Sequence, residues 1–132
     1  MKILFNFLCF YFLALQLNAQ IPEGKSVISS LYIYTLETGK AELVLKEKRH
    51  FEAPNWSHDG QFLLINASGI LEKVSIEGEK LGVLPTGDIK NANNDHGYSF
   101  DGKTLFISSS LPSIKGGSSF IFKVASEGGS PI

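Results

Sequence analysis

The densest group of side chains able to bind a ligand is a run of four polar residues: Asn93, Asn94, Asp95 and His96. Glu52 stands at the matching place in an earlier copy of the same segment. Carboxylate, amide and imidazole groups together can bind a cation, a sugar or the terminus of a peptide. The sequence therefore predicts a ligand-binding site at Glu52 and residues 93–96. The alternative is a hydrogen-bonded network that only orders the starts of two strands.

Other chemistry is poorly represented in the sequence. There is no Gly-x-Ser-x-Gly nucleophile motif and no His-Glu-x-x-His zinc motif, and Cys9 is the only cysteine. Basic residues are scattered and the formal net charge is −1, so no nucleic-acid footprint is present. We expect no catalytic residues, no resident metal and no cofactor within this chain.

An internal repeat of 42 residues sets the elements that must position the candidate site. Residues 54–65 read P-N-W-S-H-D-G-Q-F-L-L-I, and residues 96–107 read H-G-Y-S-F-D-G-K-T-L-F-I. In each copy an aromatic residue and a serine lead into an Asp-Gly turn and then an apolar strand. This pattern is typical of one small antiparallel sheet that begins twice. Alignment of Trp56 with Tyr98 places Glu52 against Asn94, at one mouth of the channel that the innermost strands would line.

The repeated motif residues themselves are expected to be structural. The aspartates should accept backbone N–H groups across the turn, and the glycines should adopt a left-handed conformation. The aromatic residues should wedge between neighbouring sheets as core residues, with their polar atoms satisfied. The residues concerned are Trp56, Ser57, Asp59, Gly60, Tyr98, Ser99, Asp101 and Gly102.

The spacing of strands and turns predicts an all-β protein built as a β-propeller. Short β-branched and aromatic runs alternate with Gly, Asn, Asp and Ser, and four strands in 42 residues are typical of one propeller blade. We expect a half-blade at about 25–48, a blade at about 50–88 and a blade at about 93–132. Because a ring needs at least about four blades, this is an incomplete propeller of about two and a half to three blades. Closure would require further blades or another chain.

The first nineteen residues predict export. Lys2 is followed by an apolar stretch from Ile3 to Leu17 and by the small residue Ala19. This is the pattern of a signal peptide, and it is too short for a membrane span. Cys9 lacks the small residues upstream that a lipoprotein signal requires, so no membrane anchor is expected. The sequence thus predicts a signal peptide at 1–19 and a mature protein, residues 20–132, in the periplasm or outside the cell.

The motifs W-S-H-D-G-Q and Y-S-F-D-G-K resemble the W-S-P-D-G-K repeat of the TolB family of periplasmic β-propellers. The likeness covers roughly residues 21–132, with His58 and Phe100 where the family usually has proline. The same repeat is shared by the propellers of prolyl-oligopeptidase-type peptidases and of oligogalacturonate lyases. Similarity to TolB implies a non-catalytic module that binds a protein or peptide in the cell envelope. The alternative is the propeller part of a peptidase or lyase whose catalytic residues lie largely beyond residue 132.

Overall fold

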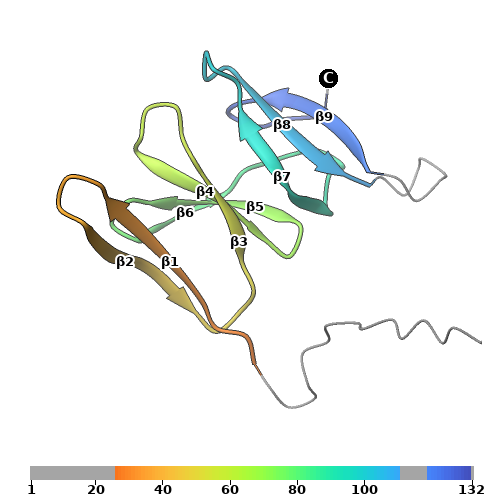
Figure 1. Cartoon of the computed structure of the whole chain (residues 1–132). Helices are drawn as coiled ribbons and strands as arrows, with labels where there is room; N and C mark the ends of the chain where they lie inside the picture. Colours follow the sequence, from red (N-terminus) through yellow and green to blue (C-terminus); the bar gives the residue numbers. More distant parts are fainter. Residues whose placement is uncertain (1–25, 111–118, 132) are drawn as a thin grey trace, which may run out of the picture.

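The computed structural model describes residues 26–110 and 119–131, and within these ranges the protein is all-β (Figure 1). Nine strands form three separate antiparallel sheets, which we call blades 1, 2 and 3 in chain order. Blade 1 contains β1 (Ser29–Thr35) and β2 (Lys40–Glu47). Blade 2 contains β3 (Glu52–Trp56), β4 (Phe62–Ala67), β5 (Ile70–Ser75) and β6 (Lys80–Val83). Blade 3 contains β7 (Ala92–Tyr98), β8 (Thr104–Ser109) and β9 (Phe120–Ala125).

The three blades fan out side by side without closing into a ring (Figure 1). Each blade is a meander in which consecutive strands pair. These features confirm the predicted all-β class and the incomplete β-propeller. The predicted signal peptide at 1–19 lies outside the described residues. Among the described residues no helix is long and apolar enough to cross a membrane.

The Asp-Gly turns have the structure that the repeat predicts. The Ser57 hydroxyl donates to Asp59 Oδ1 at 2.7 Å and accepts from the backbone N–H of Phe62 at 3.0 Å. The hydrogen bond from Ser57 lowers the pKa of Asp59, so the Asp59 carboxylate is ionised when it accepts this bond. Gly60 has a φ of 71°, a conformation that strains any residue with a Cβ atom. The second turn repeats this arrangement through Ser99, Asp101, Gly102 and Thr104.

The core lies between the blades. Strand β4 sends Leu63 and Ile65 into a cluster with blade 1, whereas Leu64 enters a second cluster with blade 3. A strand with apolar residues on both faces is expected where a sheet is covered on both sides. Burial of a leucine of this kind contributes about 1.5–3 kcal/mol. The second cluster is the larger and consists of Leu64, Leu71, Leu84, Ile89, Ala92, Leu105, Ile107 and Val124.

An ion-pair cluster also joins blade 1 to blade 2. The Arg49 guanidinium donates to both carboxylate oxygens of Glu72 on β5, at 2.9 and 2.6 Å. It also donates to Glu47 at the end of β2 at 2.5 Å, and Glu47 pairs with Lys80 on β6. The hydrogen bond to Glu72, followed by that to Glu47, raises the pKa of Arg49 above its ordinary value. A planar guanidinium satisfies two carboxylates in this way, which an ammonium group cannot do with the same geometry.

The two motif aromatic residues differ from the prediction and from each other. Tyr98 packs against the cluster between blades 2 and 3, as expected, but its buried hydroxyl has no hydrogen-bond partner among the described residues. Burial raises the pKa of Tyr98 to about 12. Trp56 is 50% exposed, so its expected burial in the core is wrong. The physical reason is that blade 1 has only β1 and β2 in the described part of the chain, and these do not cover the indole ring.

Candidate functional site

The predicted site residues lie on the innermost strands of two adjacent blades. Glu52 is the first residue of β3, and residues 93–96 lie within β7. Strands β3 and β7 contact one another across the junction between blades 2 and 3 (Figure 1). The structure therefore brings the two segments to neighbouring strands, and the ligand-binding role of the residues stays a prediction.

Asn93 is engaged in hydrogen bonds within blade 3. Its side-chain amide donates to the hydroxyl groups of Ser108 at 2.8 Å and Ser119 at 3.3 Å. Its side-chain carbonyl oxygen accepts a hydrogen bond from the backbone N–H of Asp95 at 3.0 Å. These contacts make Asn93 a residue that orders the strand. Asn94 and Asp95 are exposed and have free side chains with respect to the described residues.

His96 differs from the exposed residues Asn94 and Asp95 in its burial. Its side chain is partly buried, and neither ring nitrogen has a hydrogen-bond partner in residues 26–110 and 119–131. Burial lowers the pKa of His96, opposed in part by the backbone of Leu64 and Asn93 and by Asp95. A neutral imidazole between two blades is thus the form that the fold favours.

Glu52 lies beside an irregularity in β3. The register of β3 against β4 shifts between Glu52 and Asn55, and Ala53 within this bulge has a φ of 51°. A non-glycine residue in this left-handed region costs on the order of 1–3 kcal/mol, and such strain occurs often at functional sites. The Glu52 carboxylate is 3.5 Å from the Nε2 atom of His50. No group of three or more His, Cys, Asp or Glu side chains is placed to hold a metal ion in the described ranges.

Asn66, which the sequence did not reveal as important, holds the start of β7 in place. It is 2% exposed and donates from its side-chain amide to the carbonyl groups of Ala92 at 2.8 Å and Asn93 at 3.0 Å. Its carbonyl oxygen accepts the backbone N–H of Gly69 at 2.7 Å. A buried amide with all these partners fixes the strand that presents Asn94 and Asp95. A polar residue within the apolar run 62–67 was the only sign of it in the sequence.

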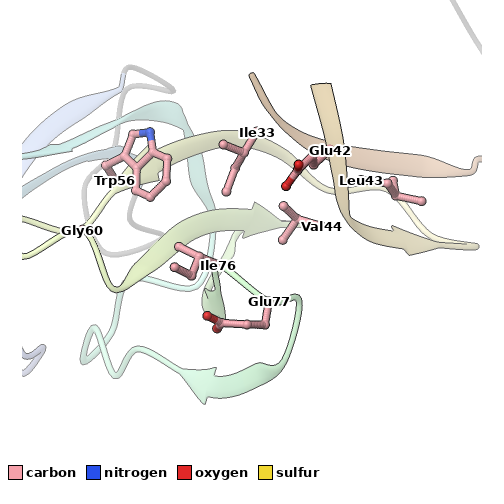
Figure 2. Close-up of a pocket in the computed structure, with 8 residues that line it drawn as sticks. All are labelled: Ile33, Glu42, Leu43, Val44, Trp56, Gly60, Ile76 and Glu77. Carbon is pink, nitrogen blue, oxygen red and sulfur yellow. The ribbon is translucent and has the colours of Figure 1, made fainter. Parts of the chain in front are cut away.

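Two clefts open beside the Asp-Gly turns. Both lie at the ends of β3 and β7 that are farthest from Glu52 and residues 93–96. The larger, of about 540 Å³, lies between blades 1 and 2. We call it the Trp56 cleft, and Figure 2 shows the indole and Ile76 across it from Ile33 and Val44. Its lining residues are Ile33, Glu42, Leu43, Val44, Trp56, Gly60, Ile76 and Glu77.

The smaller cleft, of about 210 Å³, lies at the equivalent place between blades 2 and 3. It is lined by Ser57, His58, Asp59, Phe62, Tyr98, Gly102, Ser126 and Glu127. The two clefts share an aromatic residue, a turn glycine and a glutamate at equivalent positions of the repeat. Sequence analysis missed both, because they form between segments whose approach the repeat alone does not specify.

Comparisons with known proteins give a consistent relationship. No model of a known protein family matches the sequence. The chain is 39% identical over 109 residues to an uncharacterised protein of Agrobacterium fabrum, covering 82% of this chain and 36% of that protein. It is 38% identical to a solved structure of a protein provisionally named TolB from Agrobacterium tumefaciens, with a TM-score of 0.70, covering 82% of this chain and 38% of that one.

A second solved structure, TolB from Acinetobacter baumannii, is similar in fold. The identity is 18% and the TM-score 0.58, over 74% of this chain and 24% of that one. The chain therefore spans little more than a third of the length of the two Agrobacterium relatives.

Proposed function

Because this chain is a TolB-like segment of a β-propeller, we propose that it serves as an exported, non-catalytic binding module of the cell envelope, with a protein or peptide as its partner. The observation that carries this proposal is the joint likeness in sequence and fold to a TolB structure, at 38% identity and a TM-score of 0.70. The alternative, the propeller of a peptidase or lyase, has no comparable support, because the solved structure at 38% identity is described as a TolB protein.

Export is the part of this proposal that depends on residues 1–19. The apolar stretch and Ala19 support cleavage of a signal peptide, with release of a mature chain that begins at Gln20. N-terminal analysis of the protein recovered from the periplasm tests this directly. We expect a chain that starts at or near Gln20, and an intact Met1 on the recovered protein would contradict export by this route.

The exposed residues Asn94 and Asp95 offer one surface for a partner. They lie at the inner edge of blade 3, and Asn66 and Asn93 fix the strand that carries them. A rigid strand that presents an amide and a carboxylate loses little conformational entropy when a partner binds. Hydrogen-bond donors of a peptide backbone or a basic side chain suit this pair of acceptors.

A pull-down with the full chain tests the binding function. The tagged wild-type protein, an Asn94→Ala/Asp95→Ala variant and an Asp88→Ala control are exposed to envelope extract. Asp88 is an exposed carboxylate in the connection between blades 2 and 3, so its loss matches the charge change at a different place. We expect a discrete partner with the wild type and the control, and a weaker recovery with the double variant. Recovery of no partner above background with any of them would count against a binding module.

A further inference from the structure

In the clefts between blades 1 and 2 and between blades 2 and 3, the later blade contributes equivalent residues, whereas the wall from the earlier blade differs. Each has the motif aromatic residue on the inner strand, Trp56 or Tyr98, and a glutamate in the turn after the third strand, Glu77 or Glu127. The glutamates are equivalent because each lies within the same turn, closed by a hydrogen bond from Gly78 N to Ser75 O in blade 2 and from Gly128 N to Ala125 O in blade 3. The partner of the glutamate in one cleft therefore indicates what the glutamate of the other cleft can bind.

A lysine of the protein itself contacts two of the residues that line the cleft between blades 2 and 3, Glu127 and Phe62. The Nζ atom of Lys73, on β5, is 3.6 Å from the Glu127 carboxylate and 4.9 Å from the centroid of the Phe62 ring. The Lys73 side chain is only 20% exposed. This cleft thus pairs an ammonium group with a carboxylate and an aromatic face, an arrangement in which the ion pair and the cation–π contact both favour the charged amine.

The corresponding lysine is missing from the Trp56 cleft. Lys73 lies two residues before Ser75, whose carbonyl begins the turn, and Lys123 in blade 3 lies likewise two residues before Ala125. In blade 1 the carbonyl that begins the turn belongs to Thr35, which accepts from Gly39 N. Two residues before Thr35 is Ile33, which lines the Trp56 cleft.

The Trp56 cleft consequently has acidic and aromatic groups without a cation. Neither Glu42 nor Glu77 forms an ion pair with any residue of the ranges 26–110 and 119–131. Trp56 is 50% exposed, and tryptophan offers the most favourable ring face for a cation. The remaining walls, Ile33 and Ile76 among them, are apolar, as the aliphatic stem of a long basic side chain requires (Figure 2).

We propose that the Trp56 cleft binds a lysine or arginine side chain from an extended segment of a partner protein, paired with Glu77 as Lys73 is paired with Glu127. The charged group pairs with Glu77 or Glu42, and its aliphatic stem lies against Ile33, Val44 and Ile76. This inference rests on the proposed binding function and assigns to it a second surface, at the end of β3 opposite to Glu52. It also names the chemistry of the partner, which is a basic residue beside apolar ones.

Trp56 is the only tryptophan of the sequence, so its fluorescence reports on the cleft. The probe is the peptide acetyl-Ala-Leu-Arg-Leu-Ala-amide, titrated into the full chain. The control peptide has citrulline, which is neutral and nearly the same shape, in place of arginine. We expect a saturable change in the emission of Trp56 with the arginine peptide and an affinity for the citrulline peptide that is lower by about threefold to tenfold, since one ion pair and one cation–π contact are lost.

Two matched substitutions locate the site. Glu77→Gln should weaken binding of the arginine peptide by about threefold to tenfold, whereas Glu127→Gln, the same change at the glutamate that Lys73 already pairs with, should leave it unchanged. Ile33→Lys should supply the missing ammonium group from within the chain and suppress peptide binding. Circular dichroism of each variant checks that the β-structure is retained, and Glu77→Gln remains decisive if Ile33→Lys does not fold.

Three outcomes would overturn the proposal. The first is that the fluorescence of Trp56 shows no saturable response, because another segment covers the cleft. The second is that the arginine and citrulline peptides bind with equal affinity. The third is that Glu77→Gln and Glu127→Gln weaken binding of the arginine peptide equally. The pull-down is run in parallel with Glu77→Gln. Equal recovery of a partner by the wild type and this variant, without peptide binding, refutes the cleft and leaves the binding function in place, whereas recovery of no partner by either protein refutes the function itself.

Discussion

The turn glycines Gly60 and Gly102 provide a test of how closely blades 2 and 3 pack. Both have left-handed backbone, with φ angles of 71° and 70°. A Cβ atom built on Gly60 meets no atom within 4 Å, whereas one built on Gly102 overlaps the Cγ atom of His58 and lies 2.6 Å from its Cβ atom. The atoms contacted are near the His58 backbone, so rotation of the imidazole ring does not relieve the overlap.

The two alanine substitutions should therefore differ in their effect on stability. Gly60→Ala should reduce the free energy of unfolding by about 1–2 kcal/mol, the cost of a left-handed alanine. Gly102→Ala carries the same cost, and the overlap with His58 adds about 1–3 kcal/mol as in an overpacked core. The total expected for Gly102→Ala is about 2–5 kcal/mol.

Urea denaturation of the full chain, followed by circular dichroism, measures both values, with an unchanged m-value showing that only stability has altered. The His58→Gly substitution completes a double-mutant cycle, because it removes both the Cγ atom and the Cβ atom that the added methyl group overlaps. In the His58→Gly background the additional cost of Gly102→Ala over Gly60→Ala should largely disappear. Equal losses for Gly60→Ala and Gly102→Ala, within about 0.5 kcal/mol, would refute the close approach of the two turns.

Three further substitutions test contacts between blades. Asn66→Ala should lower stability in urea by about 2–3 kcal/mol, because two carbonyl groups lose a buried donor; a loss below about 0.5 kcal/mol would contradict this role. Burial lowers the pKa of His96, so the unfolded chain binds the proton more readily and stability should fall as the pH decreases below about 6.5. His96→Gln should reduce that pH dependence, and an identical profile between pH 5 and 7 would be the contrary result. Arg49→Lys should lose the bidentate contact with Glu72 and cost about 1 kcal/mol in this partly exposed setting, whereas Lys48→Ala, an exposed control, should cost nothing measurable.

The strands and turns of this protein were predictable because they depend on local properties of the chain. Alternating apolar residues define a strand from its own sequence, and an Asp-Gly pair defines a turn through hydrogen bonds that span only a few residues. The contacts of Ser57 and Asp59 are of this kind, and the same contacts recur in the second copy. The repeat then specified the blade, since it gives the order in which the strands pair.

The candidate site was predictable only as a neighbourhood. The repeat placed Glu52 and residues 93–96 on equivalent strands, and the structure has them on adjacent inner strands. It did not reveal that Asn93 is engaged with Ser108 or that His96 is partly buried. Both depend on residues that lie on other strands, and sequence spacing gives no measure of those distances.

The repeat by itself determined the architecture of each blade, because the strand period and the turn chemistry act over a few residues. Only the tertiary structure decided which motif aromatic residue packs against the core, since Tyr98 has blade 2 beside it and Trp56 has a blade 1 with two strands in the described part of the chain. It also decided that Lys73 pairs with Glu127, whereas Ile33, at the equivalent position of blade 1, provides no cation for Glu77. Burial and charge pairing depend on the neighbours that packing supplies, and those neighbours are distant in the sequence.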